Sequence, residues 1–138
     1  MDQPIARLLL ILVIAASSAL CSSAQESLDA PTKEVIYGHK DGLAMTFDVF
    51  EPDAEPNGAA VVFIVSGGWF SKWAPPSQTR IPLTPFLAAG YKGFAVRHGS
   101  SPRYSIAEAV SDVRRAIRTI RRDAEQYGIN GDRIGVIG

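Results

Sequence analysis

The chain has 138 residues, a length that suits one domain and is too short for two. Apolar residues make up 46% of it and charged residues 20%, as in ordinary folded proteins, and 14 basic side chains balance 14 acidic ones. A formal net charge of zero provides no overall field to attract nucleic acid or an anionic membrane, so we expect neither as a partner.

Residues 1–24 have the layout of a secretory signal peptide. Arg7 precedes a short apolar run at 8–16, and small residues then lead to Ser22-Ser23-Ala24. The run is shorter than the roughly 20 apolar residues that cross a bilayer, which favours cleavage after Ala24 over an uncleaved anchor or a buried helix. We therefore expect export to the periplasm or the extracellular space, with no stable membrane insertion after cleavage.

Cys21 is the only cysteine of the chain. Lipid attachment to it is disfavoured, because Leu20 is bulky where that processing site requires a small residue. Cleavage after Ala24 would leave a mature chain with no disulfide and no thiolate chemistry. His39 and His98 are the only histidines, so no Cys/His cluster is available for zinc and no metal site is expected.

The first predicted elements are the two strands of a hairpin. Residues 33–37 favour a strand, and Asp41-Gly42 is a hairpin-turn signal. Apolar and polar side chains alternate over residues 45–49, which is the pattern of a half-buried strand. The apolar, β-branched run at 59–65 then predicts a strand that is buried on both faces of a parallel sheet.

The second half of the chain alternates helices with strands. Residues 70–82 contain three prolines and are expected to be irregular, residues 83–89 to form a short helix, and residues 93–96 the next buried strand. Residues 133–138 open a further buried strand. This order is typical of an α/β fold with an antiparallel hairpin, then parallel strands with crossover helices, about five strands in all.

The longest predicted helix begins at Ser105, which forms a capping box with Glu108, and it ends by Gly128. Apolar residues recur at intervals of three and four and predict one stripe facing the core: Ile106, Val110, Val113, Ile117, Ile120 and Ala124. Five arginines between residues 114 and 122 lie opposite that stripe, without aromatic residues among them. We favour a solvated helix face over a patch for phosphate or nucleic acid.

A glycine-rich turn, Ser66-Gly67-Gly68-Trp69, directly follows the strand at 59–65. Ligands of open α/β sheets bind at the carboxyl ends of the strands, and consecutive glycines let backbone N–H groups approach a ligand closely. An oxyanion hole requires such donors. A plain turn with Trp69 packed on the core explains the same pattern equally well.

Five segments resemble, in the same order, those of α/β-hydrolases, in particular bacterial carboxylesterases and lipases of the feruloyl- and acetyl-esterase type. These segments are 48–52, 66–69, 90–97, 112–120 and 132–134. The second departs from the family's H-G-G-G-W pattern, with Val65 and Ser66 in place of the histidine and the first glycine. The resemblance implies that Gly138 is the first glycine of the G-x-S-x-G nucleophile elbow. Residues 25–138 would then be an incomplete α/β-hydrolase domain, truncated before this elbow.

The resemblance further implies a serine-dependent carboxylic ester hydrolase that needs no cofactor and acts on small-molecule or polysaccharide-linked esters. The amides of Gly67 and Gly68 would form the oxyanion hole, and a later His–Asp pair would activate the serine. The chain itself would hold no residue of the triad and would be inactive alone. Two alternatives stay open: a non-catalytic fragment or binding module on this scaffold, and a serine peptidase of the same fold.

His98 and three aromatic residues complete the candidate site. Because the family's catalytic histidine follows the serine along the chain, His98 is expected to order and line the pocket and not to act as the base. The aromatic residues after the turn either line a substrate pocket or pack in the core or a lid, namely Trp69, Phe70 and Trp73. Arg97 and Asp112 are hypothesised to pair and hold the intervening loop on the helix.

Overall fold

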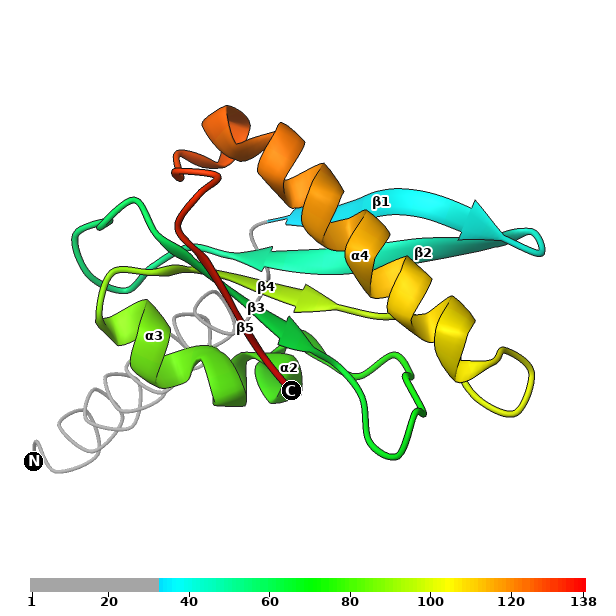
Figure 1. The fold of residues 1–138 in the computed structure, drawn as a ribbon. Helices are drawn as coiled ribbons and strands as arrows, with labels where there is room; N and C mark the ends of the chain where they lie inside the picture. The colour runs from blue at the N-terminus through cyan, green and yellow to red at the C-terminus, as the bar shows by residue number, and fades with distance from the viewer. Residues whose placement is uncertain (1–32) are drawn as a thin grey trace, which may run out of the picture. The chain divides into compact units, whose positions relative to one another are not determined.

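The computed structural model describes residues 33–138, which form one mixed five-stranded sheet with helices on both faces (Figure 1). The predicted signal peptide and Cys21 lie outside these residues. No helix in the described part of the chain is long and apolar enough to cross a membrane. The strands are β1 (Lys33–Lys40), β2 (Leu43–Phe50), β3 (Ala60–Ile64), β4 (Lys92–Val96) and β5 (Ile134–Ile137). The helices are α2 (Pro76–Arg80), α3 (Thr84–Ala88) and α4 (Ile106–Arg122), with 3₁₀ turns at Ile81–Leu83 and Ala124–Tyr127.

The strand order is β1-β2-β4-β3-β5. β2 is antiparallel to both β1 and β4, whereas β3 lies parallel to β4 and β5. The sheet therefore has the predicted antiparallel hairpin followed by parallel strands. The hairpin closes at Asp41 and Gly42, which both have positive φ, as a two-residue turn between twisted strands requires.

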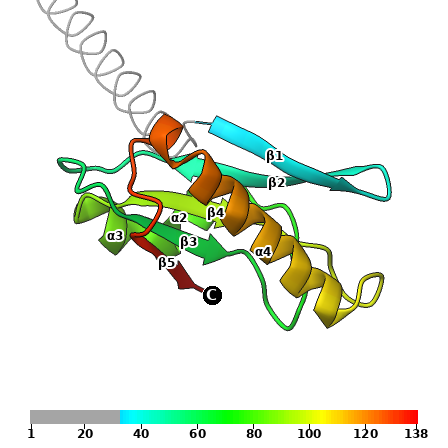
Figure 2. The same cartoon turned by 45° about the horizontal axis from the view of Figure 1, so that its top comes forward.

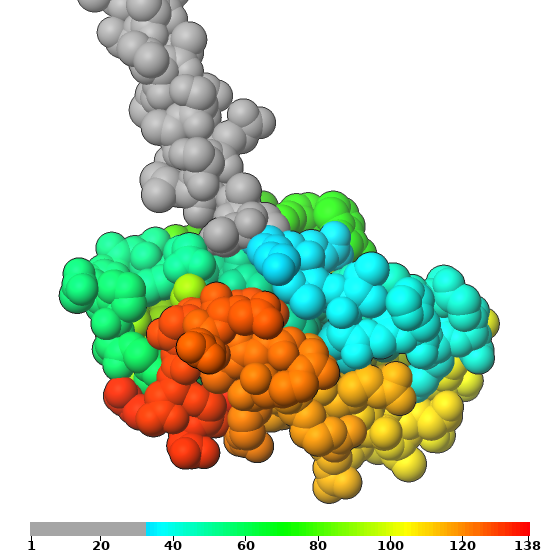
Figure 3. All heavy atoms as spheres, turned by 90° about the horizontal axis from the view of Figure 1, so that it is seen from above, coloured from blue at the N-terminus to red at the C-terminus, as the bar shows by residue number. Residues whose placement is uncertain are grey.

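Both faces of the central strands are buried, as the apolar run at 59–65 predicts. On the face that carries α4, Phe47, Val62 and Phe94 pack against Ala116 and Ile120. On the opposite face, Val61 and Ala95 pack with Phe50 against Leu83 and Leu87, beneath α2 and α3 (Figure 2). Seen from above, the atoms of α4 and the residues after it cover the sheet between the β1–β2 hairpin and the last residues of the chain (Figure 3).

The prediction of an irregular segment at 70–82 is wrong in its second half. Residues 76–88 form α2, a 3₁₀ turn and α3 in succession. A proline stands in the first two positions of each of these segments. At those positions the missing N–H would have no helical partner anyway, so these prolines start helical turns and do not break them.

α4 has the predicted capping box, since Ser105 and Glu108 bond reciprocally. The predicted apolar stripe is only partly correct. Ile120 is buried, but Ile106 is 51% exposed and Val110 and Val113 are half-buried. The buried line of the helix is instead Ala109, Asp112, Ala116, Thr119 and Ile120. Contacts of the buried Asp112 carboxylate turn this part of the helix toward the loop after β4, and Val110 and Val113 are left beside a cavity.

Candidate active site

The candidate site lies where β3, β4 and β5 end at one edge of the sheet. Because these three strands are parallel, the loops after Ile64 and Val96 leave the sheet at the same edge, close to the last residue of β5. This is the edge at which open α/β sheets bind their ligands. The turn at 66–69 is the first structure after β3.

This turn is a tight reversal closed by two hydrogen bonds between the same residues. The Gly67 amide donates to the Phe70 carbonyl at 2.9 Å, and the Phe70 amide donates to the Gly67 carbonyl at 3.1 Å. The two residues between them, Gly68 and Trp69, have φ values of +58° and +68°. Positive φ is easy for glycine but strained for a tryptophan, so the backbone of Trp69 is held in a conformation it would not choose alone.

The amides of the turn divide into one engaged and two available groups. The Gly67 N–H, which the sequence predicts as an oxyanion donor, is occupied by Phe70. Neither the Gly68 N–H nor the Trp69 N–H bonds to another residue of the described chain. Adjacent free backbone N–H groups in a turn form a concave site suited to an anion or an oxyanion.

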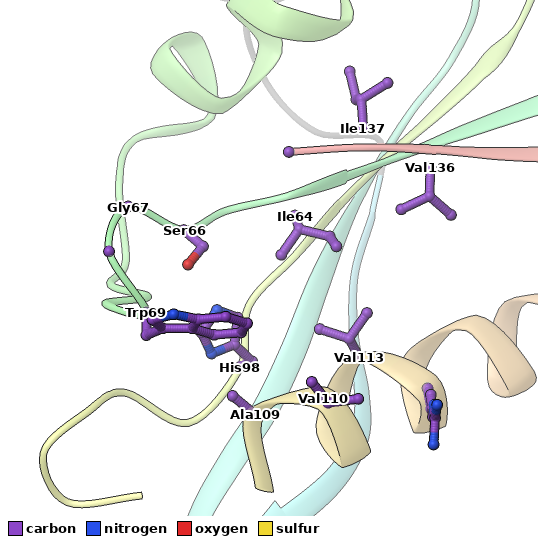
Figure 4. Close-up of a pocket in the computed structure, with 13 residues that line it drawn as sticks. Ile64, Ser66, Gly67, Trp69, His98, Ala109, Val110, Val113, Val136 and Ile137 are labelled. Atoms are coloured by element: carbon purple, nitrogen blue, oxygen red, sulfur yellow. The ribbon is translucent and has the colours of Figure 1, made fainter. Parts of the chain in front are cut away.

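A cavity of about 770 Å³ opens beside this turn. Figure 4 shows the turn and His98 on one side of it, Val136 and Ile137 of β5 on another, and α4 across from the strands. Most of the remaining wall is apolar and comes from Ile64, Ala109, Val110 and Val113. The turn that carries these hydrogen-bond donors thus borders a largely apolar hollow.

The hypothesised pair of Arg97 with Asp112 is wrong. The Arg97 guanidinium instead forms a two-pronged, buried contact with Asp48 of β2, with Nη1 to Oδ1 at 3.1 Å. β2 lies next to β4 in the sheet, with Asp48 opposite Ala95, so the Asp48 carboxylate is within reach of Arg97. Asp112 accepts hydrogen bonds from the Lys40 ammonium at 2.7 Å and from the Gly99 amide at 3.0 Å.

Tyr37 of β1 also holds the loop after β4 in place. Its hydroxyl donates to the Arg97 carbonyl. Burial, with a further contribution from the Asp112 charge, raises the pKa of Tyr37 far above its ordinary value. The phenol therefore remains a protonated donor throughout the physiological range.

The BD-FAE family model matches residues 47–138, well over half of the chain. The chain belongs to this family of α/β-hydrolase esterases. The BD-FAE match covers β3, the turn, α4 and β5, which are the elements that build the cavity.

Solved structures of esterase 2 from the planctomycete Thermogutta terrifontis have the same fold. The propionate-bound form is 25% identical with a TM-score of 0.63, over 75% of this chain and 39% of the other. The native form gives 25% identity and a TM-score of 0.63, over 75% and 38% of the two chains. The present chain thus spans about two fifths of the length of these esterase chains. No curated protein matches it in sequence.

The structure brings most of the predicted site residues to one cavity. Gly67, Gly68, Trp69, His98 and Gly138 all line it. Phe70 does not: it is 58% exposed and borders a neighbouring groove together with Trp73. The sequence missed the contribution of α4 to the cavity wall, because its apolar residues were all assigned to the core.

His98 is held in one orientation beside the cavity. Its side chain is buried, its amide donates to the Ser71 hydroxyl at 3.1 Å, and its Nδ1 lies 2.8 Å from the Gly99 carbonyl oxygen. A carbonyl can only accept, so Nδ1 is the donor in this contact. A role of His98 in ordering the pocket stays a prediction.

Gly138 approaches β3 closely. A Cβ at this position would lie 3.1 Å from the Ile64 Cβ and 3.4 Å from the Ile64 carbonyl oxygen. A side chain there would press on the strand that carries the turn, so the end of β5 favours a glycine.

Proposed function

We propose that the complete protein is a serine-dependent carboxylic ester hydrolase. The observation that carries this proposal is the pair of unengaged amides at Gly68 and Trp69, in a turn that lines an apolar cavity at the carboxyl edge of parallel strands. Attack on an ester places negative charge on the carbonyl oxygen, and preoriented N–H groups stabilise that charge. Membership of an esterase family supports the same reaction.

We place oxyanion stabilisation on Gly68, with Trp69 as its neighbour. The Gly67 amide, predicted from the sequence, would first have to leave the Phe70 carbonyl before it could donate to a substrate. Gly138 would be the first glycine of the nucleophile elbow. The serine would then come from the residues that follow Gly138 in the complete protein, next to the same cavity.

The substrates we propose are esters with short acyl groups. The cavity is walled mainly by small and branched aliphatic side chains, which suit an aliphatic acyl chain. Structures of the Thermogutta esterase hold propionate and butyrate. The alcohol side of the substrate would be a small molecule or a polysaccharide.

The test uses protein expressed from the complete reading frame. We expect hydrolysis of p-nitrophenyl acetate and butyrate, no cleavage of a peptide anilide, and covalent labelling of one serine by paraoxon. Cleavage of the anilide in preference to the esters would indicate the peptidase. Absence of both activities and of labelling would indicate the non-catalytic binding module.

We also propose that the protein is exported and that residues 1–24 are removed. The support is the charged, apolar and small-residue layout of this segment. N-terminal sequencing of protein recovered from the periplasm or the medium should begin at Gln25. Retention of the first residues in a membrane fraction would contradict cleavage.

A further inference from the structure

We propose that Ser71 and Ser100 are positioning residues that hold the oxyanion turn in its working geometry. The inference rests on the proposed function, because it concerns the turn that would stabilise the oxyanion. Neither serine lines the cavity beside the turn. They act through the backbone of the turn, which hydrogen bonds from the loop after β4 hold in place. We call this set of hydrogen bonds the clamp.

The clamp consists of hydrogen bonds between two segments that lie about thirty residues apart in the chain. The Ser100 hydroxyl accepts from the Ser71 amide at 2.8 Å and donates to the Ser71 carbonyl. The Ser71 hydroxyl accepts from the His98 amide at 3.1 Å. The Ser101 amide donates to the Trp69 carbonyl at 3.1 Å, so the contacts reach the turn itself.

The turn has little else to hold it. Residues 65–75 contain no helix and no strand beyond the isolated bridge of Gly67 with Phe70. Trp69 has positive φ, and the residue is 45% exposed, so it is only partly held by packing. A strained residue persists only where its surroundings determine it, and here these surroundings are the two Gly67–Phe70 hydrogen bonds within the turn together with the hydrogen bonds from residues 98–101.

The clamping loop is itself firmly anchored. The Gly99 amide is bonded to the buried Asp112 of α4, and Arg97 is paired with the buried Asp48 of β2. The two serines therefore connect the turn to a loop that contacts with the sheet and α4 hold rigidly. Oxyanion donors work because they are preoriented, and small displacements of such groups cost large factors in rate.

The first experiment measures the kinetics of ester hydrolysis by the complete protein. For Ser100→Ala we expect kcat to fall about tenfold with KM within twofold, because the donors act mainly in the transition state. Ser100→Thr, which keeps the hydroxyl, should recover most of kcat. Ser101→Ala is the matched control, since the neighbouring Ser101 side chain makes no hydrogen bond in the described chain.

A second measurement tests the conformation of the turn and does not depend on enzymatic activity. Trp69 and Trp73 are the only tryptophans of the chain and both lie in the clamped segment. We expect acrylamide to quench the fluorescence of Ser100→Ala and Ser71→Ala more strongly than that of the parent or Ser101→Ala, with unchanged far-UV circular dichroism. This assay is made on the complete protein and needs no substrate.

The outcomes separate the clamp from the proposed function. An active parent whose Ser100→Ala variant keeps kcat within twofold overturns the clamp and leaves the esterase proposal intact. An inactive parent overturns the esterase proposal, and the quenching assay then decides whether the serines hold the turn. Equal quenching of the parent and both alanine variants overturns the clamp in either case.

Discussion

At the scale of single residues, Gly90 is a position at which two separate features of the structure require a glycine. It follows the short helix predicted over residues 83–89, and its φ of +83° is the left-handed conformation that a glycine commonly adopts after a helix. The structure adds a second requirement, because a Cβ at Gly90 would lie 2.3 Å from the Glu55 carbonyl oxygen. That approach comes from the loop before β3, which no local pattern around Gly90 reveals.

Gly90→Ala should therefore lower the free energy of unfolding by about 3 kcal/mol, the sum of a strained φ and a backbone clash. Gly128→Ala is the matched control, because Gly128 also has positive φ but open space around its Cα. It should lose only about 1 kcal/mol. Urea unfolding followed by circular dichroism measures both, and equal losses would show that the Glu55 carbonyl moves away freely.

A second prediction at this scale concerns the buried ion pair. Arg97→Met leaves the Asp48 carboxylate buried without its partner, so we expect unfolding to become easier by about 3–5 kcal/mol. Arg103→Met removes the exposed contact with Asp41 and should change stability by less than about 1 kcal/mol. A loss in Arg97→Met no greater than that in Arg103→Met, in parallel urea titrations, would contradict the assigned role of the pair.

At the scale of elements, the start of α4 is the best-predicted feature of the chain. Ser105 and Glu108 form the expected capping box, and bonds from Ser105 lower the pKa of Glu108 below its ordinary value of 4.5. The prolines at 76 and 82 led to the wrong prediction of an irregular segment, because the effect of a proline depends on whether it stands at the start of a helical turn or within it.

Ser105→Ala should cost about 1 kcal/mol of stability at neutral pH. A carboxylate whose pKa is lowered by folding stabilises the fold above its unfolded pKa, and this contribution disappears as the pH falls through the folded pKa. Ser105→Ala keeps the backbone bond to the Glu108 carboxylate and removes only the side-chain bond, so that part of the difference between the parent and the variant should disappear below about pH 4.5. Ser111→Ala, on the exposed side of the same helix, should show neither the loss nor the pH dependence. Thermal unfolding from pH 3 to 7 makes the comparison.

At the scale of the whole molecule, the sheet has two outer strands, β1 and β5, within residues 33–138. They differ in chemistry. β1 contains charged residues at both ends, whereas β5 is Ile-Gly-Val-Ile, with Val136 48% exposed. An apolar outer strand with unpaired backbone groups is a template for association with another chain.

We expect residues 25–138 to self-associate through β5 at micromolar concentration. Val136→Lys should shift the distribution toward the monomer, because a charge on the outer strand opposes edge-to-edge pairing. Ile36→Lys, at a 55% exposed position on β1, is the control and should leave association unchanged. Sedimentation velocity measures all three, and a monomeric parent with cooperative unfolding would contradict the prediction.

The sequence by itself determined the α/β class, the hairpin, the buried strands and the place of the glycine-rich turn at 66–69. These features follow from local signals: hydrophobic periodicity, turn residues and caps act over a few neighbouring positions. Only the tertiary structure decided that Arg97 pairs with Asp48, that Val110 and Val113 border a cavity, and that the Gly67 amide is engaged. Each of these features depends on which strands are neighbours in the sheet or on where a single N–H group points. Such contacts join residues that local sequence patterns do not relate.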